Sequence, residues 1–185
     1  ACTSGGDQIT YGNGSWIGYS YYNNNFTDYR GYVTESQNFD RNWGSGSADG
    51  PNCVVGTSGN NFSVRYLMKL NKPAGTYIIE HGKDDYSRVY VGTSPVTNVS
   101  DFASLPWQTS RWSNTGLNTY LINWDGGDMY ITMEYVELKG GAQSYFYFCD
   151  NPEIKDKGYV YGSFPTWNAY LGKEIGNEVL NTSYL

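Results

Sequence analysis

Two adjacent aspartates, Asp84 and Asp85, are the residues of this chain whose type and spacing most directly suggest chemistry. They lie in the stretch GKDDYS at 82–87, a short loop between two apolar segments. Carboxylates held together in a tight loop repel each other, and hard cations such as Ca²⁺ prefer oxygen ligands of this kind. The dipeptide therefore suggests a cation site, although adjacent acids in an exposed turn are also commonly just solvated.

A third carboxylate, Glu137, occupies a position where it needs a partner. The stretch MYITMEYVE at 129–137 has the two-residue period of a strand. If Ile131, Met133 and Tyr135 face the core, Glu137 continues in the same phase at the end of the strand. A carboxylate at the rim of a core is costly to bury unless a cation or a hydrogen-bond donor satisfies it. The alternative is an ordinary residue at a strand end.

The remaining chemistry-bearing residues argue against catalysis. His81 is the sole histidine, and its strand phase favours a packed residue over a general base. The acidic pairs at 84–85 and at 134–137 are neighbours on one turn or one strand. They therefore do not flank a scissile bond from opposite sides, as the two-carboxylate glycosidase mechanism requires. We expect no enzymatic activity.

Composition sets the class of protein. The 185 residues suffice for one domain with a sizeable core, and 23 Gly, 19 Tyr and 6 Trp with only 16% charged residues are typical of an all-β protein. The formal net charge of −6 argues against nucleic acid and against anionic membranes. No apolar run approaches the roughly 18 residues of a membrane-spanning helix. We expect neither a nucleic-acid partner nor membrane insertion.

Alternation of apolar and polar residues locates the elements that position these carboxylates. At 62–70 it predicts a strand with one buried and one wetter face, followed by a Pro-Gly turn. Further strands are expected at 16–22, 77–79, 88–91, 129–137 and 144–148. Residues 1–15 are expected to form an irregular lead-in, and 93–125 to be the least regular part of the middle.

The run from Asn61 to Gly92, with its NFSVRYLMKLNKPAGTY and DDYSRVYVG segments, resembles the protective-antigen-type lectin domain of yeast flocculins and related fungal cell-wall adhesins. The aromatic stretch at 18–26 and the hairpin at 130–142 are similar to the same family. The resemblance implies an antiparallel β-sandwich with long loops at one end. It also implies that Asp84 and Asp85 are joined by a cis peptide bond and bind Ca²⁺ together with a sugar.

The resemblance further implies how the late hairpin completes the site. In fungal adhesins its loop supplies an Asn side chain and backbone carbonyls to the calcium ion. Glu137 stands where those adhesins carry the Asn, and the carbonyls of Lys139 and Gly141 are the backbone candidates. The side chains of Lys139 and Gln143 are candidates for sugar contacts.

Aromatic side chains on loops offer flat faces on which sugar rings stack, although plugging the end of a sandwich is their commoner role. Trp107 and Trp112 are the leading candidates for ligand contact because they follow the acidic loop by one strand.

Three cysteines allow one disulfide and a free thiol, with three possible pairings. Adhesins of the resembled family tie their N-terminal segment to the C-terminal one. By that resemblance we expect Cys2 to pair with Cys149, leaving Cys53 unpaired.

The expected protein is a single carbohydrate-binding adhesin domain over residues 1–185, with 150–185 as a C-terminal extension packing on the sandwich. We expect a mature product that is secreted and attached to a cell wall. Five Asn-x-Ser/Thr sequons fit a secreted chain. The expected function is calcium-dependent binding of terminal hexoses or N-acetylhexosamines on cell surfaces, and hence cell adhesion. The alternatives are an accessory carbohydrate-binding module of a polysaccharide-degrading enzyme and a protein–protein interaction module.

Overall fold

The computed structural model describes residues 2–44, 51–54, 60–111, 116–150, 153–154, 159–162 and 171–174. Its strands up to the acidic loop are β1 (Gly12–Asn13), β2 (Ser15–Tyr21), β3 (Tyr29–Ser36), β4 (Phe39–Gly44), β5 (Phe62–Lys72) and β6 (Gly75–Asp84). Those after it are β7 (Tyr86–Gly92), β8 (Thr109–Arg111), β9 (Gly116–Trp124), β10 (Gly127–Glu137), β11 (Ala142–Cys149), β12 (Glu153–Ile154), β13 (Tyr159–Gly162) and β14 (Leu171–Glu174). Two short 3₁₀ helices, η1 (Asn52–Val54) and η2 (Val99–Ser104), complete the described elements.

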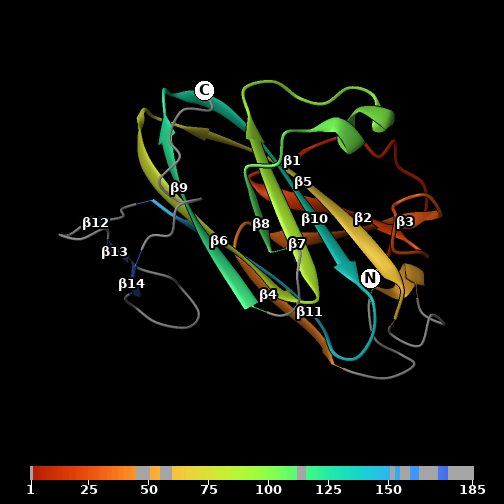
Figure 1. Ribbon diagram of the computed structural model, residues 1–185. Helices are drawn as coiled ribbons and strands as arrows, with labels where there is room; N and C mark the ends of the chain where they lie inside the picture. Colours follow the sequence, from red (N-terminus) through yellow and green to blue (C-terminus); the bar gives the residue numbers. More distant parts are fainter. Residues whose placement is uncertain are drawn as a thin grey trace.

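Two sheets form the sandwich (Figure 1). One has the order β3-β2-β5-β10-β7-β8, with β1 pairing in parallel with β5, and the other has the order β4-β11-β6-β9. The main core lies between them, with Trp16, Phe62 and Met133 from the first sheet and Ile79 and Phe146 from the second. The expected all-β antiparallel sandwich is therefore confirmed. Within the described residues, neither 3₁₀ helix is long and apolar enough to span a membrane.

The pairing of β5 with β10 forms the centre of the larger sheet. It continues without a break from Lys72 opposite Gly127 to Phe62 opposite Glu137. The expectation of a wetter face on β5 is wrong, because Arg65 and Leu67 are as buried as the core residues between them. Their face is covered by a second apolar cluster that includes Phe102 of η2. A central strand covered on both sides has no solvated face.

Arg65 is satisfied on this covered face by an ion pair. Its Nε lies 2.8 Å from Glu134 Oε2, and the Nη2 of Arg88 lies 2.7 Å from Glu134 Oε1. Glu134 is 1% exposed, so its carboxylate depends on these two guanidinium groups. The Arg65 guanidinium also stacks on the rings of Phe26 and Phe102.

Two of the expected irregular segments are more ordered than the sequence indicated. In the N-terminal lead-in, β1 pairs with β5, and Thr3 exchanges two backbone hydrogen bonds of 2.8 Å with Tyr32. Between 93 and 125 the chain forms η2, β8 and all of β9, which pairs with β6 along its length. Long-range pairing stabilises these strands although their local sequence lacks a clear period.

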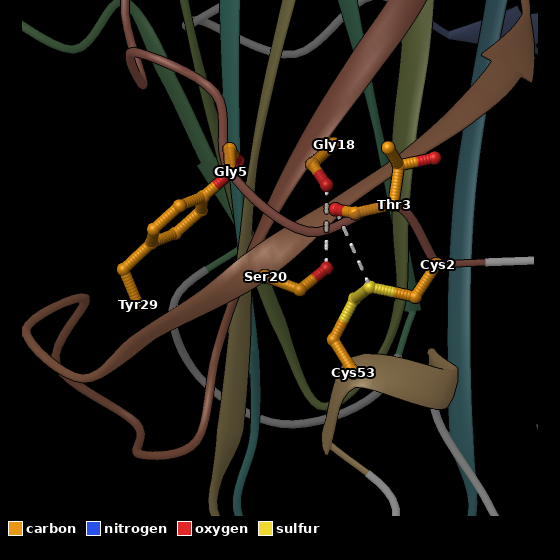
Figure 2. Close-up of a disulfide and its surroundings, with 7 residues drawn as sticks. All are labelled: Cys2, Thr3, Gly5, Gly18, Ser20, Tyr29 and Cys53. Carbon is orange, nitrogen blue, oxygen red and sulfur yellow. Dashed lines mark hydrogen bonds between the residues drawn. A yellow bond between two sulfur atoms is a disulfide. The ribbon is translucent and has the colours of Figure 1, made fainter.

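The disulfide joins Cys2 to Cys53, not to Cys149 (Figure 2). The bridge between Thr3 and Tyr32 holds the N-terminal segment against the edge of the larger sheet, where η1 contacts β2 and β3. The Cα atoms of Cys2 and Cys53 are 5.4 Å apart. Cys149 ends β11 in the other sheet and is buried there beside Ile78 and Tyr147. The expected pairing is wrong because it assumed a C-terminal position for the partner cysteine.

Strands β12, β13 and β14 pair with one another as a third, three-stranded sheet. The predicted packing of 150–185 on the sandwich stays a prediction, since most of these residues lie outside the described part of the chain.

Removing the Cys2–Cys53 bond should destabilise the domain substantially. The bond closes a separation of 51 residues, for which the chain-entropy model gives about 4 kcal/mol. We expect Cys2→Ser to lower the free energy of unfolding in guanidinium by about that amount, and reductant to have no further effect on it. In the control Cys149→Ala, reductant should still lower the unfolding midpoint. A Cys2–Cys149 peptide in a non-reducing digest would contradict the assignment.

Glu134→Gln should cost about 3 to 5 kcal/mol of stability, because it leaves two guanidinium groups without their buried counter-charge. Glu35→Gln is the matched control. Its partner Arg41 is 53% exposed and can be solvated, so about 1 kcal/mol is expected. Equal losses of unfolding free energy in the two variants would show that burial of the ion pair has no special weight.

Candidate functional site

The acidic pair forms the turn between β6 and β7, at the lower end of the sandwich in Figure 1. Strand β6 ends at Asp84 and β7 begins at Tyr86, so the turn is shorter than the expected six-residue loop. The peptide bond between Asp84 and Asp85 is cis, the geometry implied by the resemblance. The Tyr135 hydroxyl donates a hydrogen bond to the carbonyl oxygen of Asp84.

Glu137 lies beside this turn. Each of the three carboxylates offers an oxygen that lies within 4.8 Å of the others; we call Asp84, Asp85 and Glu137 the acidic cluster. Glu137 is the last residue of β10 and, two residues after core-facing Tyr135, points into the end of the core. Its side chain is 0% exposed, and neither carboxylate oxygen receives a hydrogen bond from a donor in the described structure.

The hairpin loop after β10 fixes one member of the acidic cluster. The backbone amides of Leu138 and Lys139 both donate to Asp85 Oδ2, over 2.8 and 3.3 Å. Gly141 packs against the other aspartate, since a Cβ on it would lie 3.2 Å from Asp84 Oδ2. The turn and the loop therefore form one structural unit, although they are more than 50 residues apart in the sequence.

Burial and mutual repulsion shift the protonation of the acidic cluster. Burial, reinforced by the two aspartates, raises the pKa of Glu137 to about 10. Burial and the neighbouring Asp85 raise the pKa of Asp84 to about 6. Burial also acts to raise the pKa of Asp85, but the hydrogen bonds that it accepts outweigh this and hold it below its usual value.

This arrangement fits a divalent cation of the Ca²⁺ type. It offers only oxygen ligands, which hard cations prefer, from two backbone elements with different geometry. The two oxygens of Glu137 are buried without donors, and such groups need a cation or a proton. Within the described residues, every ion pair formed by Lys or Arg lies outside the acidic cluster.

The structure places the residues predicted on the late hairpin around the acidic cluster. Lys139 and Gly141 touch it through the backbone contacts above, and the Lys139 side chain is exposed. Gln143 pairs in register with Asp84. Its amide nitrogen lies 2.5 Å from Asp40 Oδ1, to which it donates.

The structure does not bring Trp107 to the acidic cluster. The Arg88 guanidinium lies 4.2 Å from the centre of the Trp107 ring, and Arg88 pairs with Glu134. Glu134 and Glu137 are three residues apart on one strand and so face opposite sides of the sheet. Trp107 therefore lies on the face away from Glu137, and Trp112 lies outside the described residues.

Two neighbours of the acidic cluster were not predicted as site residues. The partly buried Trp43 of β4 packs on Phe62 and Tyr135, with ring centres 5.5 and 5.7 Å apart. Asn60 Oδ1 accepts a hydrogen bond of 3.0 Å from the amide of Gly140. The sequence assigned Trp43 no role in the site, and nothing distinguished Asn60.

No family model matches the sequence, and no curated protein matches it. Solved structures match the fold. An anti-sigma factor domain-containing protein from Clostridium clariflavum has a TM-score of 0.53 and 12% identity, over 97% of this chain and 51% of that one. A second protein with the same description has a TM-score of 0.51 and 18% identity, over 95% and 49%. This chain thus spans about half the length of both.

A third match covers almost all of both chains. It is the A domain of a subtype-switched epithelial adhesin 9 from Candida glabrata in complex with β-lactose, with a TM-score of 0.51 and 13% identity over 96% of this chain and 95% of that one. At these identities the likeness shows the fold alone: this chain has an antiparallel β-sandwich like that of the adhesin A domain.

The stability of the metal-free protein should fall as the pH rises from about 6.5 to about 9. The pKa of Glu137 in the fold is about 10, above its ordinary value, so its protonation favours the folded state and is lost progressively through this range. The corresponding contribution of Asp84, whose pKa is raised to about 6, is lost mainly at lower pH. We expect the melting temperature in EDTA to decrease over this range. With saturating calcium, or in Glu137→Gln, the decrease should be much smaller.

The range begins at about pH 6.5 because the effect of His81 on stability has the opposite pH dependence and is confined to lower pH. Burial lowers the pKa of His81 to about 3, so its contribution is complete above its ordinary value of 6.5 and is lost as the pH falls below it. A melting temperature in EDTA that does not change between about pH 6.5 and 9 would contradict the raised pKa of Glu137.

Proposed function

We propose that this chain is a calcium-dependent lectin domain whose cation is held by Asp84, Asp85 and Glu137. The observation that carries the proposal is Glu137, a fully buried carboxylate without a donor, within 4.8 Å of two further carboxylates. A cation satisfies all three groups at once. The backbone carbonyls of Lys139 and Gly141 are the proposed additional ligands.

The chain's own residues would hold this site in a fixed shape before a ligand arrives. Asp85 is fixed by the amides of Leu138 and Lys139, and Asp84 by the Tyr135 hydroxyl. Gly141 keeps the approach to Asp84 free of a side chain. Bound Ca²⁺ would offer coordination positions to two neighbouring hydroxyl oxygens of a sugar in place of their hydration.

The proposed ligands are terminal hexoses or N-acetylhexosamines on cell surfaces. Support comes from the fold shared with the Candida glabrata adhesin domain, which was solved with β-lactose. Affinity for one sugar is expected to be weak, so adhesion would depend on many copies acting together. Secretion and attachment to a cell wall belong to the same proposal, as does the absence of catalysis.

Glycan binding should require calcium. On a glycan array we expect binding to neutral terminal sugars in calcium and its loss in EDTA. Asp84→Asn and Asp85→Asn should each abolish binding, and each should reduce the calcium-induced rise in melting temperature. For the wild type, calcium at 100 times its Kd should increase the free energy of unfolding by about 2.7 kcal/mol.

Asp128→Asn, at the opposite end of β10, serves as the control and should behave as the wild type. Glycan binding that persists in EDTA would contradict the proposal and favour an accessory module that binds sugars by aromatic stacking. If neither calcium nor any glycan binds, a protein–protein interaction module becomes the better interpretation.

A further inference from the structure

The acidic cluster carries one more negative charge than a divalent cation neutralises. Metal ligands bind in their deprotonated form, so Asp84, Asp85 and Glu137 bring three negative charges to the site. A bound divalent cation leaves a charge of −1. What happens to that charge depends on the cations around it.

The described cations near these strands are engaged elsewhere. Arg65 and Arg88 both pair with Glu134, on the opposite face of the sheet. The ammonium of Lys83, which precedes the turn, lies 5.1 Å from the centre of the Tyr145 ring. Lys139 is next to the acidic cluster, but its side chain is exposed and is screened by water and salt.

The burial of Glu137 strengthens the electrostatic effect of the excess negative charge on nearby groups. Its side chain is 0% exposed, and its oxygens receive no hydrogen bond from a described donor. A charge in such surroundings acts on nearby groups much more strongly than one in water. The backbone of Glu137 is held by its pairing with Phe62, and the residues before it are paired on both sides.

We propose that this residual charge determines the class of sugar, so that the site accepts neutral glycans and excludes acidic ones such as uronic acids. The inference rests on the proposed lectin function and extends it to ligand class. An acidic sugar at the metal would bring its carboxylate next to the uncompensated negative charge. The repulsion between these like charges would lower the affinity for the acidic sugar.

The first test compares sugars that differ only at C6. The probes are immobilised galactose and galacturonic acid, glucose and glucuronic acid, and mannose and mannuronic acid, all at saturating calcium. For wild-type protein we expect the neutral member of the pair it binds to be preferred by roughly tenfold or more. In Glu137→Gln, which keeps an oxygen ligand of the same shape, that preference should shrink by roughly tenfold.

Asp128→Asn is the charge-matched control. It removes one negative charge from the exposed far end of the same strand, about 30 Å away at about 3.3 Å per residue. It should leave the preference unchanged. Terbium emission excited through the nearby aromatic rings reports cation binding by each variant, separately from sugar binding.

The second test needs no substitution and so does not depend on the variant folding. Replacing Ca²⁺ by a trivalent lanthanide in the wild-type protein supplies the missing positive charge. The preference for neutral over acidic sugars should shrink as it does in Glu137→Gln. Glu137→Gln removes one negative charge and the lanthanide adds one positive charge, so each change removes the residual charge of −1.

The outcomes separate this inference from the proposed function. Equal binding of neutral and acidic sugars by the wild type, or a preference that neither Glu137→Gln nor the lanthanide alters, would overturn the inference and leave a calcium-dependent lectin. Calcium-independent binding, or no binding of any neutral sugar, would overturn the proposed function itself.

Discussion

The pairing of β5 with β10 is the constraint on which the rest of the structure depends. Both strands are buried on both faces, and their register runs unbroken to Phe62 opposite Glu137. Because side chains alternate along a strand, Glu134 and Glu137 face opposite sides of the sheet. Glu134 meets two arginines, whereas Glu137 meets two aspartates. A slip of one residue would turn each glutamate to the other face, so one register sets both the buried ion pair and the acidic cluster.

Local alternation in the sequence was enough to predict these two strands, because the two-residue period is a property of neighbouring residues. It was not enough to predict what covers each face. Arg65 was assigned to a wetter face by its charge, and its partner Glu134 lies 69 positions further along the chain. The disulfide illustrates the same limit, since the distance between Cys2 and Cys53 depends on how the N-terminal segment lies along β3. Neither the ion pair nor the disulfide can be predicted from the residues that adjoin it in the sequence.

The sequence likewise predicted some residues of the candidate site and missed others. Asp84 and Asp85 were identified by their adjacency and by a resemblance, and Glu137 by its strand phase; the structure brings all three together. Trp107 was chosen for its proximity along the chain, which carries no information about the face on which a side chain lies. Trp43 and Asn60 became neighbours of the acidic cluster only through contacts with β5, β10 and the loop after β10. Residues of this kind can be identified only from the three-dimensional structure.

The buried position of Glu137 also implies that protons and cations would compete at the proposed site. A carboxylate on a mobile loop relieves repulsion by turning into water, but Glu137 is held at the end of a strand whose other residues fill the core. Two forms of relief remain: a proton, which the pKa of about 10 reflects, or a cation. A cation must displace that proton, so metal affinity should rise with pH until the carboxylate is ionised. The rigidity of the sandwich therefore keeps the three carboxylates together in advance, so that at the proposed site less ordering would remain to oppose cation binding.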